Sequence, residues 1–142
     1  SLARILSGHE KKINLGDIST RRDWGHSKDY VRAIWLILQH KKADDFVIST
    51  GKNYSIKDFI IKVFKLINLD WKKFVTINNK KFLRPSEVRS LQGDSSKARK
   101  LLKWKPQYNL DDLCKDMLTS DLKLYGMNLD EAKKIAKKLS NK

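Results

Sequence analysis

Short β-rich runs alternate with amphipathic helical patterns along this chain, and this alternation constrains its fold more than any other feature. The β-rich runs occupy residues 12–15, 45–50 and 74–77, and each is followed by a turn or a helix-start signal. No internal repeat accompanies them. Short strands interspersed with helices are typical of α/β proteins. We therefore predict an α/β fold built from helices with a few short strands.

The helical patterns carry clear start and stop signals. A first helix is expected through about Ser7, where Gly8 stops it, and a second one from Ser27, the expected N-cap. In that second helix Tyr30, Ile34, Ile37 and Leu38 fall on one face, which predicts packing on a sheet. Four later helix starts are expected at Ser55 with Asp58 in the third helical position, at Asp94 or Ser95, at Asn109, and at Asn128 with Glu131.

Charge and cysteine content narrow the classes of function. The formal net charge is +15 over 142 residues, but the lysines are spread over the polar sides of the helices, without the signatures of specific nucleic-acid binding. The single Cys114 cannot form an internal disulfide and is expected to be buried. His9, His26 and His40 lack partners at metal-ligand spacing, so no metal site is expected. No apolar run reaches membrane-span length, and we expect a cytoplasmic protein.

Two basic stretches are candidates for binding a ligand. Arg22 stands in the stretch 21–31, just before a helix start, and Arg84 stands in the stretch 84–88 with Glu87. Two arginines in such positions can grip a diphosphate from both sides, and Glu87 can accept hydrogen bonds from ribose hydroxyls. The alternative for the first stretch is a solvated turn whose Trp24 fills the core.

No complete active site is visible in the sequence. The six glycines at positions 8, 16, 25, 51, 93 and 126 are too far apart to form a phosphate-binding loop. No tyrosine is followed by lysine four residues later, and no motif of a nucleophilic serine is present. The pairs 44–45 and 111–112 are better explained as a loop and a helix N-terminus than as paired catalytic acids.

Several motifs, taken in order, resemble the C-terminal part of GDP-mannose 4,6-dehydratase, a family of the extended short-chain dehydrogenase/reductases. These motifs are Arg-Arg-Asp-Trp-Gly-His-Ser-Lys-Asp-Tyr-Val at 21–31, Asp-Phe-Val-Ile-Ser-Thr-Gly at 45–51, Arg-Pro-Ser-Glu-Val at 84–88, Leu-Gln-Gly-Asp at 91–94, Lys-Ala at 97–98 and Leu-Lys-Trp-Lys-Pro at 102–106. The resemblance covers about residues 1–125. Residues 126–142 lie outside it and are expected to form a basic C-terminal helix or tail.

The resemblance implies the substrate-binding portion of such an enzyme, with the Rossmann core missing. The family is an NADP-dependent lyase that converts GDP-mannose to GDP-4-dehydro-6-deoxy-D-mannose, a step of GDP-fucose biosynthesis. Its catalytic tyrosine, lysine, threonine and glutamate belong to the N-terminal Rossmann domain, which also holds NADP. This chain is therefore expected to contain no catalytic residue and to be inactive alone. Its expected partners are GDP-mannose and the missing Rossmann domain, with a homo-oligomer in the parent enzyme.

The resemblance also implies roles for individual residues. Arg22 matches the arginine that contacts the diphosphate, Arg84 a second arginine on the nucleotide side, and Glu87 a ribose-side acceptor. Asn14 and Leu15 lie where the family approaches the base. The segment before Arg84 is shorter than is usual in the family. Trp24 and Trp104 are expected to be packing residues.

Two alternatives to this function remain open from the sequence. One is a fragment of another nucleotide-sugar dehydratase or epimerase, which would prefer UDP- or dTDP-sugars to GDP-mannose. The other is a stand-alone basic binding module without catalysis. Removal from a partner domain would expose apolar surface, so association or aggregation of the isolated chain is also expected.

Overall fold

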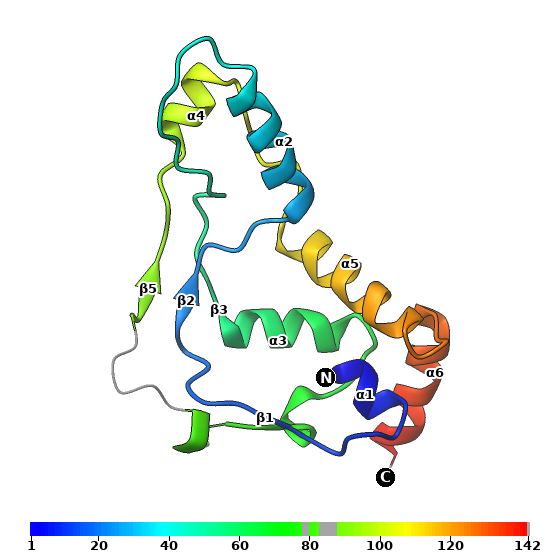
Figure 1. Cartoon of the computed structure of the whole chain (residues 1–142). Coiled ribbons are helices and arrows are strands. Elements are labelled where there is room, and N and C mark those ends of the chain that lie inside the picture. Colours follow the sequence, from blue (N-terminus) through cyan, green and yellow to red (C-terminus); the bar gives the residue numbers. More distant parts are fainter. Residues whose placement is uncertain (78–79, 83–87, 142) are drawn as a thin grey trace.

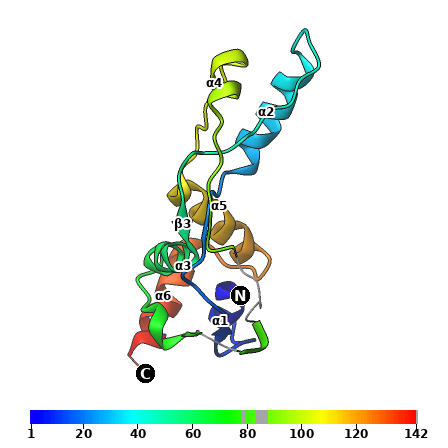
Figure 2. The same cartoon turned by 90° about the vertical axis from the view of Figure 1, so that its left-hand side faces the viewer.

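The computed structural model describes residues 1–77, 80–82 and 88–141. The molecule has a broad lower part and a narrower upper part (Figure 1), and the same division is seen from the side (Figure 2). Helices dominate, and the strands are short. The predicted α/β class is therefore confirmed.

The helices are distributed between the two parts. α1, α3 and α6 lie in the lower part, α2 and α4 lie in the upper part, and α5 runs from one to the other (Figure 1). Their bounds are α1 Leu2–Leu6, α2 Ser27–Leu38, α3 Ile56–Lys65, α4 Ser96–Leu101, α5 Leu110–Lys123 and α6 Leu129–Ser140, with short 3-10 helices η1 Trp71–Lys73 and η2 Lys80–Phe82.

The strands form two small sheets. β1 (Ile13–Asn14) pairs in parallel with β4 (Val75–Thr76). In the other sheet β2 (Arg21–Arg22) is central, with β3 (Tyr54–Ser55) antiparallel on one side and β5 (Ser90–Leu91) parallel on the other. The strands predicted within 12–15 and 74–77 are thus confirmed, and they are partners.

The helix ends follow local capping, as predicted. Ser55 accepts a hydrogen bond from the backbone N–H of Asp58 (3.0 Å), and the Asp58 carboxylate accepts one from the N–H of Ser55 (2.9 Å). Such a reciprocal pair satisfies N–H groups that no helical carbonyl can reach. The same capping box is present at two more predicted starts, with Asn109 and Asp112 at α5 and with Asn128 and Glu131 at α6. At α4 the N-cap is Ser95, one of the two predicted residues, but its side chain makes no capping hydrogen bond.

The α2 start differs from the prediction by one residue. His26, not Ser27, is the N-cap, because its Nδ1 accepts a hydrogen bond from the backbone N–H of Lys28 (3.2 Å). The predicted packing of this helix on a sheet is wrong. Ile34 and Leu38 are exposed, whereas Tyr30 and Ile37 pack against a buried cluster.

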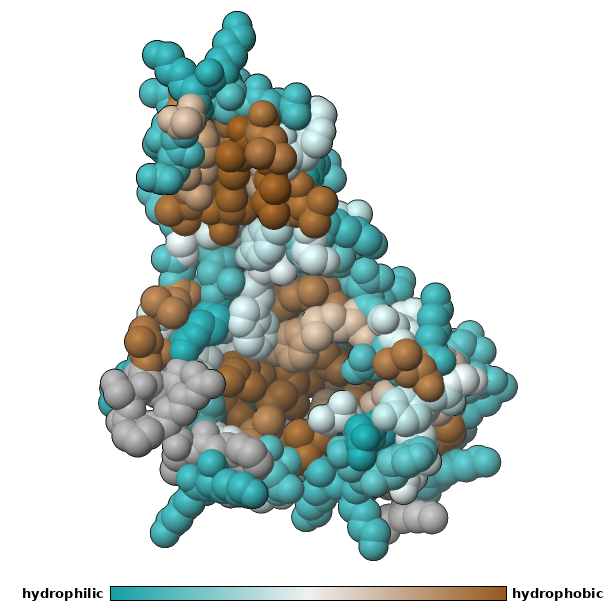
Figure 3. Space-filling view, in the orientation of Figure 1, coloured by the Kyte–Doolittle hydropathy of each residue, from teal (hydrophilic) through white to brown (hydrophobic). Residues whose placement is uncertain are grey.

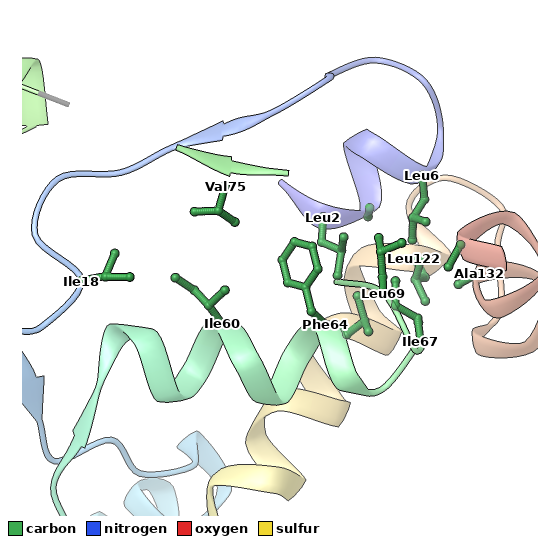
Figure 4. Close-up of a cluster of buried hydrophobic side chains, with 13 residues drawn as sticks. Leu2, Leu6, Ile18, Ile60, Phe64, Ile67, Leu69, Val75, Leu122 and Ala132 are labelled. Atoms are coloured by element: carbon green, nitrogen blue, oxygen red, sulfur yellow. The ribbon is translucent and has the colours of Figure 1, made fainter. Parts of the chain in front are cut away.

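The lower part contains the larger hydrophobic core. Residues of α1, α3, α5, α6 and β4 meet there around Phe64, which is 2% exposed (Figure 4). Burial of that much apolar surface is the main stabilising contribution in a domain of this size. The buried members are Leu2, Ala3, Leu6, Ile18, Ile60, Phe64, Ile67, Leu69, Val75, Leu118, Leu122, Ala132 and Ala136.

The upper part has a smaller core of its own. It consists of Ala33, Ala98, Leu102 and Trp104, with Phe46 and other half-buried side chains against them. Trp104 is completely buried, as expected of a packing residue. Its indole Nε1 donates a hydrogen bond to the backbone oxygen of Asp29 (3.0 Å), so the polar end of the ring is also satisfied.

One further prediction about an element needs correction. The β-rich run 45–50 pairs with no strand among the described residues. In α5 the buried stripe consists of Leu110, Cys114, Leu118 and Leu122, whereas Met117 is half exposed. The predicted turn at 78–80 lies partly outside the described residues, and Lys80 begins η2.

The C-terminal residues join the lower part. α6 packs against α1 and α5, and its Ala132 and Ala136 are completely buried in the larger core. The positive φ of Gly126 (66°) allows the turn between α5 and α6. The predicted division at residue 125 stays a prediction about sequence relationship, while in the structure α6 shares the core of the preceding helices.

Candidate functional site

Arg22 occupies the central strand of the three-stranded sheet. It stands opposite Tyr54 of β3 and Leu91 of β5. Its Nη1 donates to the backbone oxygens of Arg21 and Val88, both at 2.7 Å. The guanidinium is therefore held beside the start of β5 by backbone contacts, which reduces the freedom that binding an anion would otherwise remove.

The second predicted arginine, Arg84, stands four residues before Val88 in the sequence. Arg84 and Glu87 fall outside the described residues, and their predicted roles stay predictions. Val88, which directly follows Glu87, accepts the hydrogen bond from Arg22. The fold thus brings Arg22 to the end of the segment 84–88, although the two basic stretches are far apart in the chain.

Asn14 and Leu15 belong to the other sheet. The backbone N–H of Leu15 donates to the oxygen of Thr76 (2.8 Å), and its side chain packs against the larger core. Asn14 is exposed in β1. No contact among the described residues joins either of them to Arg22, so their proposed approach to a base stays a prediction.

Asp23 fixes the chain beside Arg22, and sequence reasoning gave it no role. Its carboxylate accepts hydrogen bonds from the backbone N–H of Thr50 (2.9 Å), the Thr50 hydroxyl (2.5 Å) and the N–H groups of Gly51 (2.8 Å) and Gly93 (3.3 Å). One carboxylate therefore ties three distant segments together. The detectable signal was the acid between a basic pair and a tryptophan, at the end of a strand.

Arg21 serves a different surface from Arg22. Successive residues of a strand point to opposite faces. Arg21 donates from Nε to the side-chain oxygen of Asn53 (3.0 Å) and lies 3.7 Å from the Asp58 carboxylate. It lines a cleft of about 900 Å³ together with Tyr54 and Lys62. The adjacent arginines thus have separate surroundings.

His26 and Lys28 converge on Asp116 of α5. Because the Nδ1 of His26 accepts the Lys28 N–H, its Nε2 carries the proton and donates to Asp116 Oδ2 (3.1 Å). Lys28 Nζ donates to the same oxygen (3.2 Å), and this bond lowers the pKa of the Asp116 carboxyl. The His26 ring also lies 4.4 Å from the ring of Tyr108, centroid to centroid. These contacts join α2 to α5.

The single thiol of the chain, Cys114, lies buried in α5. Burial raises the pKa of the Cys114 thiol to about 11, so the thiolate that a nucleophile requires is scarce near neutrality. No three His, Cys, Asp or Glu residues of the described chain converge as metal ligands. No described helix is long and apolar enough to cross a membrane. A preoriented guanidinium in the three-stranded sheet is the feature that fits an anionic ligand.

Comparison with known proteins identifies the family. The family model described as GDP-mannose 4,6 dehydratase matches residues 1–117. The chain belongs to the GDP-mannose 4,6-dehydratase family. It is 44% identical over 124 residues to GDP-mannose 4,6 dehydratase 1 of Arabidopsis thaliana, covering 87% of this chain and 34% of that protein. It is 39% identical over 145 residues to the Homo sapiens GDP-mannose 4,6 dehydratase, covering 90% and 39%.

Solved structures agree on the fold. RMD from Pseudomonas aeruginosa, complexed with NADPH, matches with a TM-score of 0.76 at 18% identity, over 87% of this chain and 40% of that one. UDP-glucose 4-epimerase of Thermotoga maritima, with UDP-glucose, matches with a TM-score of 0.67 at 26% identity, over 88% and 38%. This dehydratase-family chain spans about a third to two fifths of the curated relatives it matches.

Proposed function

We propose that this chain is the substrate-side part of a GDP-mannose 4,6-dehydratase and that Arg22 binds the diphosphate of GDP-mannose. The observation that carries the proposal is the Arg22 guanidinium, held by the Val88 carbonyl inside the segment that matches the family. Forked, backbone-supported arginines suit phosphate oxygens. Arg84 and Glu87 complete the nucleotide side in this proposal, and Asn14 and Leu15 approach the base.

The whole enzyme would convert GDP-mannose to GDP-4-dehydro-6-deoxy-D-mannose with NADP, as a homo-oligomer in the cytoplasm. The residues of this chain do not fit NADP itself. Its glycines are scattered, and the N-termini of α2, α3 and α5 are closed by their own caps, His26, Ser55 and Asn109. Cofactor binding and catalysis therefore belong, in this proposal, to a nucleotide-binding part outside this chain, and the chain alone is inactive.

Isothermal titration with GDP-mannose, GDP and UDP-glucose tests the proposal. GDP-mannose is expected to bind best, and Arg22→Ala and Arg84→Ala are each expected to weaken it at least about tenfold, because a charged phosphate contact is lost. Arg21→Ala removes the same charge from the opposite face of β2 and is the matched control. If Arg21→Ala weakened GDP-mannose binding equally, the loss of affinity would come from the change in net charge and not from a specific contact of Arg22.

The same titration distinguishes the proposed function from a second candidate, that of another nucleotide-sugar enzyme. A preference for UDP-glucose would favour another nucleotide-sugar enzyme, a reading supported by the 26% identity to the UDP-glucose 4-epimerase of Thermotoga maritima. Binding of none of the three ligands would contradict a nucleotide site preformed in this chain.

A further inference from the structure

Three segments of the chain cross next to one another between the three-stranded sheet and the upper part of the molecule (Figure 1). β2 continues through Asp23 to α2, β5 continues through Gly93 to α4, and residues 49–51 lead into β3. On the face shown in Figure 3, paler and hydrophilic side chains separate the apolar areas of the two parts at the level of these crossings. Polar contacts are therefore the ones that can hold the three segments together here.

The Asp23 carboxylate joins the three crossing segments. Its Oδ1 accepts hydrogen bonds from the backbone N–H of Thr50 (2.9 Å) and from the Thr50 hydroxyl. Its Oδ2 accepts from the backbone N–H groups of Gly51 (2.8 Å) and Gly93 (3.3 Å). One side chain at the end of β2 is thus bonded to the chain that enters β3 and to the chain that leaves β5.

The loop 50–53 is itself fastened to β5. Asn53 donates from Nδ2 to the hydroxyl of Ser90 (2.8 Å) and to a backbone oxygen of the same strand (3.1 Å). Val88, whose carbonyl holds the Arg22 guanidinium, stands two residues before Ser90. A shift of the loop would therefore pass through β5 to the contact that orients Arg22.

Close packing couples these segments further. A Cβ added to Gly93 would lie 2.5 Å from the Cβ and 2.7 Å from the Oγ of Ser49. The Ser95 hydroxyl donates to the backbone oxygen of Ser49 (2.9 Å), and both serines are buried. Groups packed this closely transmit a displacement to their neighbours. The hydrogen bonds of Asp23 therefore act on the end of β5 and on the loop together.

The charge of Asp23 would have the opposite effect on an anionic ligand from its hydrogen bonds. A carboxylate that follows Arg22 directly in the chain repels a phosphate, so removing its charge would strengthen binding if no atom moved. Removing its hydrogen bonds would weaken binding, because a guanidinium that loses its orientation must be ordered again by the ligand. The sign of the change in affinity therefore distinguishes the two effects.

We propose that Asp23 is a positioning residue for the diphosphate of the nucleotide sugar. Its hydrogen bonds hold β5 and the loop 50–53 against β2, and the Val88 carbonyl then keeps the Arg22 guanidinium oriented before the ligand arrives. The inference rests on the proposed function for the identity of the ligand. Asparagine at this position retains one acceptor oxygen, but its amide nitrogen is a donor and would face donors.

Isothermal titration with GDP-mannose compares the wild type, Asp23→Asn, Arg22→Ala and the variant that combines both changes. Asp23→Asn is expected to weaken binding at least about fivefold, although it removes a negative charge. In the Arg22→Ala background the same change is expected to cause no further loss, because Asp23 acts through that guanidinium. Asp17→Asn is the matched control: it removes the same charge before β2, where Asp17 accepts the backbone N–H of Ser19 (2.7 Å).

A milder variant and a spectrum without ligand complete the test. Thr50→Val removes one donor to Asp23 without changing the charge, and about twofold weaker binding is expected. Nitrogen-15 NMR of the arginine side chains reports the orientation of Arg22, because hydrogen bonds slow the rotation of a guanidinium. The two Nη resonances of Arg22 are expected to be separate in the wild type and to merge in Asp23→Asn. Circular dichroism checks the folding of each variant.

Each outcome decides the proposal. Unchanged or tighter binding by Asp23→Asn, an equal loss in Asp17→Asn, or a full further loss in the Arg22→Ala background would overturn it. If Asp23→Asn failed to fold, wild-type affinity in Thr50→Val would overturn it instead. A wild type that binds no GDP-mannose would contradict the proposed function. The spectra would even then decide the role of Asp23, since separate Arg22 resonances in Asp23→Asn would show that this carboxylate does not orient the guanidinium.

Discussion

Asp29 is the buried carboxylate on which the junction between α2 and the chain before α5 depends. The residue is 1% exposed. Its Oδ2 accepts hydrogen bonds from the backbone N–H groups of Gln107 (2.9 Å) and Tyr108 (3.0 Å), and its Oδ1 lies equally close to the first of these (2.9 Å). Replacing Asp29 therefore strips two backbone N–H groups of their partner.

The magnitude follows from those two donors. A hydrogen bond to a charged acceptor is worth about 1.5–3 kcal/mol, so Asp29→Ala, which removes the acceptor of two backbone N–H groups, is expected to lower the free energy of unfolding by about 4 kcal/mol. Asp29→Asn keeps one carbonyl oxygen that can accept from both donors but loses the charge, and a loss of about 2 kcal/mol is expected. Asp121→Ala, an exposed acid of α5, is the control and should change stability by less than about 0.5 kcal/mol.

Urea denaturation followed by tryptophan fluorescence measures these differences. With a slope of about 2 kcal/mol per M, Asp29→Ala should lower the midpoint by about 2 M and Asp29→Asn by about half as much. An unchanged dependence of the unfolding free energy on urea concentration in each variant would show that the midpoint shift reports a change in stability alone. A loss below about 1 kcal/mol for Asp29→Ala would refute the reasoning that this carboxylate satisfies otherwise unpaired donors.

Further predictions concern three local features. Ser55→Ala should cost about 1 kcal/mol in urea unfolding by removing the α3 cap. The hydrogen bond from the Ser55 N–H lowers the pKa of the Asp58 carboxyl in the folded protein. The ionised carboxylate therefore stabilises the fold fully above the unfolded pKa of about 3.9, and this contribution is lost as pH falls through the folded pKa. The free energies of unfolding of wild type and Asp58→Asn should accordingly become equal in acid. Gly93→Ala would place a Cβ 2.5 Å from the Ser49 Cβ and should cost about 1–3 kcal/mol, whereas an unchanged melting temperature would contradict that close packing. Cys114, with a thiol pKa of about 11, should react with a thiol reagent at pH 8 at least about 100-fold more slowly when native than in urea, and equal rates would contradict its burial.

The helices were largely predictable because their signals are local. The caps of α3, α5 and α6 join side chains and backbone groups three residues apart, so they act in any tertiary context. His26 was overlooked as the α2 cap because histidine is not among the usual capping residues, and only its position beside Asp116 shows why its ring is oriented to accept from Lys28.

The candidate site was predictable only in part. The resemblance indicated Arg22, but the bond from Arg22 to Val88 spans two segments that no local pattern connects. Asp23 was missed for the same reason, since the N–H groups that donate to its carboxylate belong to Thr50 and Gly93, both far along the chain. Arg84 and Glu87 remain predictions.

The sequence by itself determined the α/β class, most helix boundaries and the family, because capping, helical periodicity and ordered motifs are carried by neighbouring residues. Only the tertiary structure decided which side of α2 is buried. Periodicity marks apolar residues around much of that helix, and the contacts with Phe46, Ala98 and Trp104 select Tyr30 and Ile37 for the core while Ile34 and Leu38 stay outside. The reason is that burial depends on which surfaces meet, and a pattern within one helix contains no information about its neighbours.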